Sequence, residues 1–217
     1  MKGVVKQVAL TPNVPQFWEK LYAEGKDIWT FGKAAPPLLD FFKSPLCPKS
    51  GDVLIPAAGK GFCAEAWAKR GYNTVAVDFC PTAVDYLELL TDKYDNLTVL
   101  NMDIFLLDPH DEKRCGRKFD IIYDYCGFNS IHPGRRDECV EMWHKMLKDD
   151  GLVIGFFGPL SDKGGEGQEA VPPYSISRSE LEVRLEGSFD IKKKIIPKRG
   201  FKTRIGREEI WLLRKVL

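Results

Sequence analysis

Two glycines and two aspartates in this sequence are spaced as a site for a nucleoside-like ligand would require. Gly59 and Gly61 form a Gly-Lys-Gly turn directly after a short apolar run. Because glycine has no β-carbon, the backbone can turn sharply there and a ligand can lie directly against it. Asp78 ends the next apolar run, where a carboxylate accepts hydrogen bonds from both hydroxyls of a ribose, and Asp103 follows a third run. The pattern predicts a ligand crevice at the ends of three neighbouring strands.

Three interpretations fit the glycine turn. Residues 59–64 match the G-x-G-x-x-G/A pattern of dinucleotide-binding turns, although one match of this length is weakly specific. The turn can instead hold the methionine part of S-adenosylmethionine (SAM), or it can be a tight strand-to-helix connection without a ligand. Asp78 argues against an empty turn, because it falls where a ribose would lie. Asp103 favours SAM, since a polar side chain there can meet the adenine amino group. At 217 residues the chain is also too short for a second nucleotide-binding half with a catalytic domain.

Alternating strand and helix patterns surround these residues. A helix is expected to begin at residues 64–70, and others near residues 82–94, 135–147 and 177–187. Residues 149–151 (Asp-Asp-Gly) are expected to form a turn before the fifth strand. The predicted strands are residues 52–56, 74–78, 97–101, 119–123, 151–157, 189–197 and 208–216.

This alternation predicts an α/β fold whose sheet is mostly parallel, with helices on both faces. A terminal hairpin after five strand–helix units is typical of the seven-stranded, doubly wound sheet of class I SAM-dependent methyltransferases, a Rossmann-like fold with one antiparallel strand near the edge. The length suits a single domain over residues 1–217. Residues 1–45, rich in aromatics and prolines, are expected to form a helical lid, and residues 46–217 the core with its C-terminal β-hairpin.

Composition narrows the classes of partner. The 32 Lys and Arg residues nearly balance 31 Asp and Glu residues, so no overall field steers nucleic acid or an anionic membrane to the chain. No signal peptide or transmembrane run is apparent. The six scattered cysteines contain no C-x-x-C pair and the three histidines form no zinc signature, so neither disulfides nor a metal site is predicted. A cytoplasmic, monomeric enzyme acting on a small molecule is expected.

Five short motifs, in the same order, resemble those of the thiopurine, thiol and halide methyltransferases, a SAM-dependent family acting on small molecules. They are the aromatic segment 18–29, the turn 53–61, residues 72–78, Phe-Asp-Ile-Ile-Tyr-Asp-Tyr at 119–125 and Val-Pro-Pro-Tyr at 171–174. The resemblance runs from about Phe17 to the C-terminus. Three departures stand out: Ala57 and Ala58 replace a Gly-Cys or Leu-Cys pair, Tyr22 replaces a commoner tryptophan, and Val171 replaces a glycine near the substrate.

The resemblance implies roles for individual residues. Aromatic faces attract a sulfonium as they attract other cations, so three N-terminal aromatics are expected to close over SAM. Tyr125 is expected beside the transferred methyl group as a cofactor and catalytic contact. Tyr174 is expected to shape the acceptor pocket as a second catalytic contact, unless it is only an aromatic on a surface loop. The residues assigned to the cofactor are Trp18, Tyr22, Trp29, Ala57, Gly59, Gly61, Asp78, Asp103, Ile104 and Tyr125.

Structural alternatives stand beside these roles. Trp18 and Tyr22, four residues apart, share a helical face that could simply pack the N-terminal helix on the core. Asp124 could be a capping carboxylate. Cys126 is expected to be a buried small hydrophobe, because no His or Lys adjoins it. Lys60 lacks a surrounding P-loop pattern and is expected to be solvated.

The expected reaction is methyl transfer from SAM to a small soft nucleophile, with a thiol favoured. Displacement at a sulfonium carbon needs nucleophile, methyl carbon and leaving sulfur near one line in a dry pocket. A thiol with a pKa of about 8.5 is partly ionised at neutral pH, so no dedicated general base is expected. The alternatives are a halide methyltransferase, an NAD-dependent oxidoreductase, and an RNA-binding module suggested by the basic residues between 192 and 207, whose simpler role is solubility.

Overall fold

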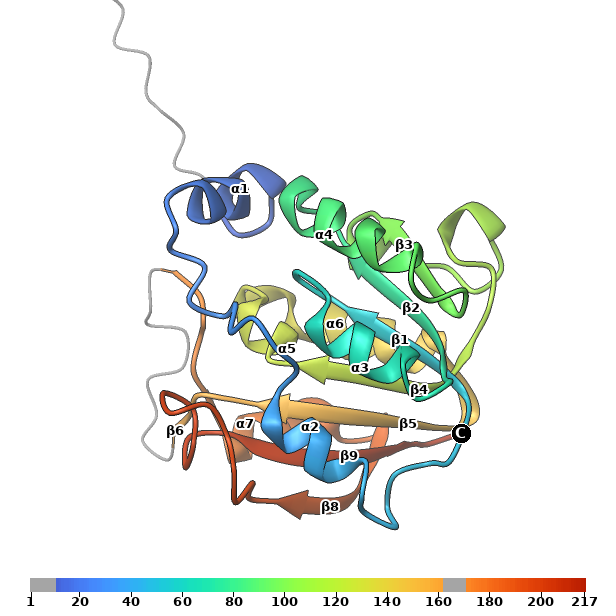
Figure 1. Cartoon of the computed structure of the whole chain (residues 1–217). Helices are drawn as coiled ribbons and strands as arrows, with labels where there is room; N and C mark the ends of the chain where they lie inside the picture. Colours follow the sequence, from blue (N-terminus) through green and yellow to red (C-terminus); the bar gives the residue numbers. More distant parts are fainter. Residues whose placement is uncertain (1–10, 162–170) are drawn as a thin grey trace, which may run out of the picture.

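The computed structural model describes residues 11–161 and 171–217, and a seven-stranded sheet forms its centre (Figure 1). The strands lie in the order β3-β2-β1-β4-β5-β9-β8. Strand β9 is antiparallel to both of its neighbours, β5 and β8, and the other paired strands of this sheet are parallel. The predicted seven-stranded, mostly parallel, doubly wound sheet is confirmed. The bounds are β1 Asp52–Pro56, β2 Asn73–Asp78, β3 Leu97–Asn101, β4 Phe119–Tyr125, β5 Leu147–Phe157, β8 Phe189–Ile195 and β9 Glu209–Lys215.

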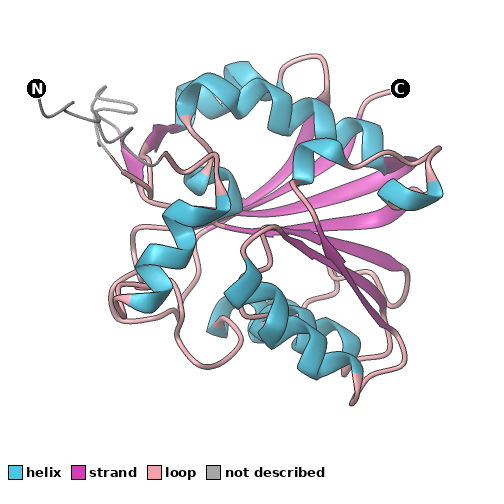
Figure 2. Ribbon diagram, turned by 90° about the horizontal axis from the view of Figure 1, so that it is seen from above, coloured by secondary structure: helices cyan, strands magenta, loops and turns pink. Residues whose placement is uncertain are grey.

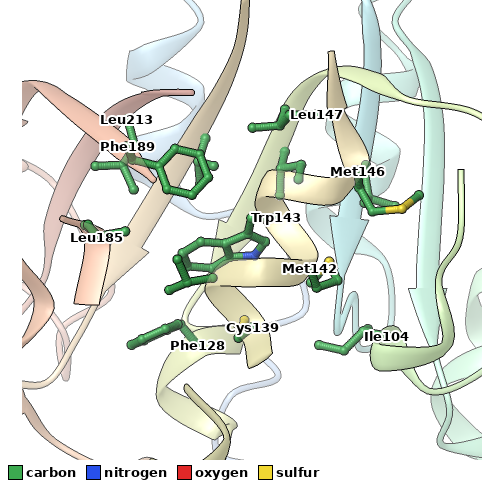
Figure 3. Packing of buried hydrophobic residues seen from close by; sticks show 14 of the residues in the cluster. Ile104, Phe128, Cys139, Met142, Trp143, Met146, Leu147, Leu185, Phe189 and Leu213 are labelled. Atoms are coloured by element: carbon green, nitrogen blue, oxygen red, sulfur yellow. The ribbon is translucent and has the colours of Figure 1, made fainter. Parts of the chain in front are cut away.

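Helices cover both faces of the sheet (Figure 2). One apolar cluster is centred on Trp143 of α6, which lies among Phe128, Leu185 and Phe189 (Figure 3). A second cluster, on the opposite face, contains Trp67 of α3. The helix bounds are α1 Pro15–Ala23, α2 Pro36–Phe41, α3 Phe62–Ala68, α4 Pro81–Thr91, α5 Gly127–Ser130, α6 Arg136–Met146 and α7 Arg178–Leu185.

The central strands are apolar along their length because both of their faces are buried. In β1, Val53 and Ile55 belong to one cluster and Leu54 to the other. A strand covered by helices on both sides has no polar face, which explains why the sequence shows a continuous apolar run instead of an alternation.

The predicted turn at residues 149–151 is wrong. Strand β5 begins at Leu147, directly after α6, and pairs there with Phe119. The register then shifts, so that Leu152 opposes Ile121. The polar residues between these pairs are therefore extended and form an irregularity within the strand. Gly151 is required there, because a β-carbon would lie 2.7 Å from a methyl carbon of Leu147.

A small parallel sheet of β6 (Leu160–Ser161) and β7 (Ile176–Ser177) was not predicted. Strands of two residues are too short to give a periodic signal in the sequence. The remaining strands and the four helices that were predicted lie within a few residues of their expected places, and β3 matches its predicted bounds. The division into a lid of residues 1–45 and a core of residues 46–217 stays a prediction.

Two chain-wide features can be checked directly. All six cysteines carry free thiols in this structure. Over residues 11–161 and 171–217, none of the helices combines the length and apolar character needed to cross a bilayer.

The strand order reverses between β1 and β4. From β1 the chain continues to β2 and β3 on one side, whereas β4 continues to β5 on the other. In open α/β sheets, the crevice outside the carboxyl ends of the strands at such a reversal is the usual place for a ligand. The glycine turn leaves β1 at this point.

Candidate active site

A cavity opens at the reversal of strand order. Its walls come from the ends of β1, β2 and β4, from the N-terminal segment around α1, and from the loop that precedes β9. Nine of the residues predicted from the sequence line it, whereas Gly61 and Tyr174 do not. The nine are Trp18, Tyr22, Trp29, Ala57, Gly59, Asp78, Asp103, Ile104 and Tyr125.

The two glycines of the turn serve different purposes. Both have left-handed backbones, with φ of 55° at Gly59 and 80° at Gly61. A β-carbon on Gly61 would lie 2.4 Å from a methyl carbon of Leu87, so this glycine allows α3 and α4 to pack. A β-carbon on Gly59 would lie 3.7 Å from the Tyr22 hydroxyl oxygen. That distance is an ordinary contact, so the left-handed backbone, and not crowding, is what favours glycine at position 59.

Asp78 joins the end of β2 to the glycine turn. One carboxylate oxygen accepts a hydrogen bond from the Gly59 N–H at 2.8 Å, and the other accepts one from the Cys80 N–H at 3.0 Å. The residue is 8% exposed. Burial raises the pKa of Asp78 above its ordinary value, and the backbone N–H groups oppose that rise. Each carboxylate oxygen has further acceptor capacity, so Asp78 can also bind hydroxyl groups in the cavity.

Asp103 lies two residues beyond β3 and caps a short 3₁₀-helix, Ile104–Leu106, by accepting the Phe105 N–H at 3.0 Å. Arg135, which no sequence pattern singled out, interacts with Asp103 and also lines the cavity. The Arg135 guanidinium lies 3.9 Å from the centre of the Phe105 ring. This end of the cavity therefore combines a carboxylate, a buried isoleucine and a ring covered by a cation.

Three aromatic side chains from the N-terminal segment form one cluster against the cavity. The Trp29 ring meets Trp18 and Tyr22 edge to face, with ring centres 5.2 and 5.4 Å apart. The Trp29 indole N–H also donates to the Tyr22 hydroxyl at 3.0 Å. The aromatic cluster thus brings together the three residues that the sequence assigned to the cofactor.

Lys60 is not solvated, so that expectation is wrong. Its ammonium lies 2.9 Å from an Asp27 carboxylate oxygen, and both side chains are only 16% exposed. It also lies between the rings of Tyr22 and Tyr86, 4.9 and 4.8 Å from their centres. The ion pair joins the glycine turn to the N-terminal segment. An ion pair across 33 residues leaves no local trace in the sequence, which explains the error.

Glu19 joins α1 to the start of α4, which lies beside it in Figure 1. Its carboxylate accepts hydrogen bonds from the Thr82 N–H at 2.7 Å, the Thr82 hydroxyl at 2.9 Å and the Cys80 thiol at 2.8 Å. Burial raises the pKa of Glu19, but these donors outweigh it and leave the pKa below its ordinary value. The carboxylate also sits favourably at a helix N-terminus.

An arginine that the sequence analysis attributed to solubility lines the other end of the cavity. The Arg204 guanidinium lies 5.2 Å from the centre of the Tyr125 ring and 5.5 Å from that of Phe31. The Phe31 ring in turn stacks on Phe201 at 3.7 Å. Within the described ranges no carboxylate lies within 4.0 Å of Arg204. Arg204 is therefore a cation in the cavity wall that makes no direct ion pair with the described carboxylates, although the Glu208 carboxylate attracts it from farther away.

Cys126 and Asp124 flank Tyr125. Cys126 is buried as expected, with a left-handed backbone (φ of 60°), and an Arg204 guanidinium nitrogen lies 2.5 Å from its sulfur. Burial raises the pKa of the Cys126 thiol to about 12, which argues against a nucleophile. Asp124 caps α5 by accepting the Phe128 N–H at 3.2 Å, and burial raises its pKa to about 7. Asp124 therefore acts as the capping carboxylate that was one of its two expected roles.

Tyr174 is 3% exposed and lies outside the cavity wall. Its backbone N–H donates to the Asn129 carbonyl at 2.7 Å, and its carbonyl accepts from the Asn129 amide at 2.9 Å. Its ring packs against His132. Pro172 and Pro173, just before it, line the cavity instead. The two prolines of the Val-Pro-Pro-Tyr motif at 171–174 therefore contact the site, whereas its tyrosine does not.

The groups along the cavity fit SAM. Asp78 offers a carboxylate for ribose hydroxyls, the aromatic cluster offers ring faces and edges for a sulfonium, and Gly59 lines the cavity with backbone alone. No basic residue of the glycine turn is free for a pyrophosphate, because Lys60 is paired with Asp27.

Proteins with similar sequences carry related names. A model of the thiopurine S-methyltransferase (TPMT) family matches residues 13–198. Probable thiol methyltransferase 2 of Arabidopsis thaliana is 31% identical over 179 residues, covering 80% of this chain and 73% of the relative. Thiocyanate methyltransferase 1 of the same plant is 27% identical, covering 88% and 82%. Thiopurine S-methyltransferase of Legionella pneumophila is 24% identical, covering 76% and 77%.

Solved structures share the fold at lower identity. The Burkholderia thailandensis 1,6-didemethyltoxoflavin-N1-methyltransferase, bound to 1,6-didemethyltoxoflavin and S-adenosylhomocysteine, has a TM-score of 0.71 at 19% identity, covering 94% of this chain and 87% of that one. The Synechocystis magnesium protoporphyrin IX methyltransferase, bound to SAM, has a TM-score of 0.68 at 11% identity, covering 97% and 100%. Because the family model spans most of its length, the chain belongs to the thiopurine S-methyltransferase (TPMT) family and is a SAM-dependent methyltransferase.

Proposed function

We propose that this enzyme methylates the sulfur of a small thiol, in its thiolate form. The observation that carries the proposal is Arg204, a cation in the cavity beside Tyr125 with no carboxylate within 4.0 Å among the described residues. A sulfur anion could pair directly with Arg204, which no described carboxylate does, and the aromatic walls suit a soft, polarisable atom. Relatives named for thiol, thiopurine and thiocyanate methylation support the same acceptor chemistry.

The cofactor would be held along the ends of the first three strands. Asp78 would accept hydrogen bonds from the ribose hydroxyls, and Asp103 with Ile104 would contact adenine. Ala57 and Gly59 would lie against the methionine part. When bound, SAM supplies an electrophilic methyl group on a positively charged sulfur. The aromatic cluster would surround that charge and exclude water, with each ring contributing about 0.5–2 kcal/mol of attraction.

The protein would accelerate the reaction mainly by aligning the two reactants, and would form no covalent bond with either. Bringing two reactants into alignment can lower a barrier by on the order of 7–11 kcal/mol in favourable cases. Here the N-terminal segment forms one side of the cavity. It is held there by the hydrogen bond of Glu19 with the Thr82 N–H of α4 and by the ion pair of Asp27 with Lys60 of the glycine turn. Arg204, Phe31 and Phe201 close the other side. A cytoplasmic location belongs to the same proposal, because small thiols and the six free cysteines stay reduced there.

A second candidate acceptor is a halide or pseudohalide anion. Arg204 favours it as well, since such anions need only a cation and an apolar wall. The relative named thiocyanate methyltransferase points the same way.

One assay separates these acceptors. S-adenosylhomocysteine formation is measured with an alkanethiol, a thiopurine, thiocyanate and iodide at equal concentrations, and calorimetry measures the binding of SAM and NAD. The proposal expects SAM binding and the highest kcat/KM for the alkanethiol or the thiopurine. Turnover of thiocyanate or iodide alone would favour the second candidate, and SAM binding without turnover of either the alkanethiol or the thiopurine would overturn the proposal.

A further inference from the structure

A buried carboxylate, Glu208, lies directly behind the cavity wall and has no role in the proposed function. The residue is 2% exposed. One carboxylate oxygen accepts a hydrogen bond from the Tyr125 hydroxyl at 3.4 Å. Its other oxygen is buried and, within residues 11–161 and 171–217, has no hydrogen-bond partner. Buried polar atoms without partners are rare in folded proteins, and each calls for an explanation.

The fold makes room for Glu208 at this place. Glu208 immediately precedes β9, while Tyr125 ends β4, and β5 lies between these two strands in the sheet. The carboxylate therefore reaches Tyr125 past the end of β5, where the chain continues into Gly158. A β-carbon on Gly158 would lie 2.9 Å from the Glu208 β-carbon. The absence of a side chain at Gly158 allows the approach.

The charged and titratable groups that face Glu208 are Arg204, Tyr125, Cys126 and Cys63. Burial raises the pKa of Glu208 above its ordinary value, and the attraction of Arg204 partly opposes that rise. Burial also raises the pKa of Tyr125, so its hydroxyl keeps its proton at neutral pH. A neutral hydroxyl can pass a proton on, and a buried carboxylate with raised pKa can keep it.

We propose that Glu208 accepts the proton of a neutral thiol through the Tyr125 hydroxyl, an inference that rests on the proposed function. The thiol S–H bond breaks and its proton moves to the Tyr125 oxygen, while the Tyr125 O–H proton moves to the unprotonated Glu208 carboxylate. The sulfur electron pair then forms the bond to the methyl carbon, and the carbon–sulfur bond to the leaving thioether breaks. The proton leaves Glu208 for solvent after product release. This differs from the expectation that no general base is needed.

The relay predicts a difference between two kinds of acceptor. An alkanethiol is mostly protonated at neutral pH and would need Glu208. Thiocyanate is already an anion and has no proton to lose. Both sulfur acceptors use the same cavity and the same cofactor, so each serves as the control for the other.

The test compares ethanethiol with thiocyanate in the wild type, Glu208→Gln and Tyr125→Phe, by S-adenosylhomocysteine formation between pH 6 and pH 10. Glutamine keeps the size of the side chain and accepts from Tyr125, but cannot take a proton. The ratio of kcat/KM for ethanethiol to that for thiocyanate at pH 7 should fall about 100-fold in both variants, as removal of a general base predicts. The deficit should shrink as the pH approaches the pKa of ethanethiol, because solvent then supplies the thiolate.

The outcomes that contradict the relay differ from those that contradict the proposed function. Equal losses with both acceptors at every pH would mean that Glu208 only supports the structure, and an unchanged ratio would mean that it takes no proton; either overturns the relay. A wild type that binds SAM but methylates neither acceptor would overturn the proposed function itself.

Discussion

The Gly59 N–H donates to the Asp78 carboxylate at 2.8 Å, across 19 residues of sequence. This hydrogen bond fixes the turn after β1 relative to the end of β2. The two features that the sequence singled out separately are therefore one unit, and a change to Asp78 acts on both the ribose position and the turn.

Replacing Asp78 tests the cofactor site. Asp78→Ala should weaken SAM binding by roughly 1.5–3 kcal/mol, because hydrogen bonds to a charged group are lost. Asp78→Asn should lose less, since an amide oxygen still accepts the Gly59 N–H. Isothermal titration with SAM and S-adenosylhomocysteine measures both variants. Unchanged affinity in Asp78→Ala would remove Asp78 from the cofactor site.

The fold and the cofactor end of the site could be predicted because local patterns carry them. Strand β3 coincides with an apolar run that has clear ends, the Gly59–Gly61 turn comes shortly after β1, and Asp78 is the last residue of β2. Parallel strands bring such ends together, so residues far apart in sequence meet by topology alone.

The acceptor end of the site could not be predicted, because its contacts join residues that are far apart in the sequence. Arg204 meets Cys126 across 78 residues and Glu208 meets Tyr125 across 83 residues. Arg204 lies in the basic segment 192–207, for which solubility is the simpler role, and Glu208 directly follows that segment. No local pattern links either residue to the cavity. Tyr174 was misplaced for a related reason, since the sequence cannot show that Asn129 holds its backbone away from the cavity.

Ala57 should be strained. Its φ of 49° lies in the left-handed region, where an L-residue with a β-carbon costs about 1–2 kcal/mol. Ala57→Gly should therefore raise the free energy of unfolding by about 0.5–1 kcal/mol after the larger backbone entropy of glycine is subtracted. Urea denaturation measures it, with Ala58→Gly as the control, because Ala58 has no positive φ. Destabilisation of equal size in both variants would count against strain at Ala57.

Arg204 should act on the acceptor more than on SAM. Arg204→Met keeps the aliphatic stem but removes the charge, so the KM for thiocyanate should rise roughly tenfold to a hundredfold, in line with the loss of a charged contact. Arg204→Lys should restore part of the loss. Steady-state kinetics and SAM titration separate the two sides of the reaction. A defect confined to SAM affinity would show that Arg204 faces the cofactor.

Asp124 should make stability fall as the pH rises. Its pKa is about 7 in the folded chain, against 3.8 ordinarily. The folded state therefore holds this proton more tightly, and the stability it contributes, complete below pH 3.8, is lost as the pH rises through about 7. Asp124→Asn should remove this dependence. In urea denaturation, the free energy of unfolding of Asp124→Asn minus that of the wild type should increase by roughly 2 kcal/mol between pH 5 and pH 8. A difference that stays constant with pH would show that Asp124 does not titrate there.

The ion pair of Lys60 and Asp27 should hold the aromatic cluster over the cofactor site. Because both side chains are only 16% exposed, the pair is screened less than a surface pair. Lys60→Met and Asp27→Asn should each weaken SAM binding, and the double variant should be little worse than either. The coupling from this cycle should be about 1 kcal/mol in SAM-binding free energy.

Lys26→Met is the matched control, because the Lys26–Glu24 pair lies in the same segment at 2.7 Å but is exposed. Additive losses would show that the two residues act separately. An equal loss in Lys26→Met would mean that any charge removed from this segment weakens binding, with no particular role for the contact at the glycine turn.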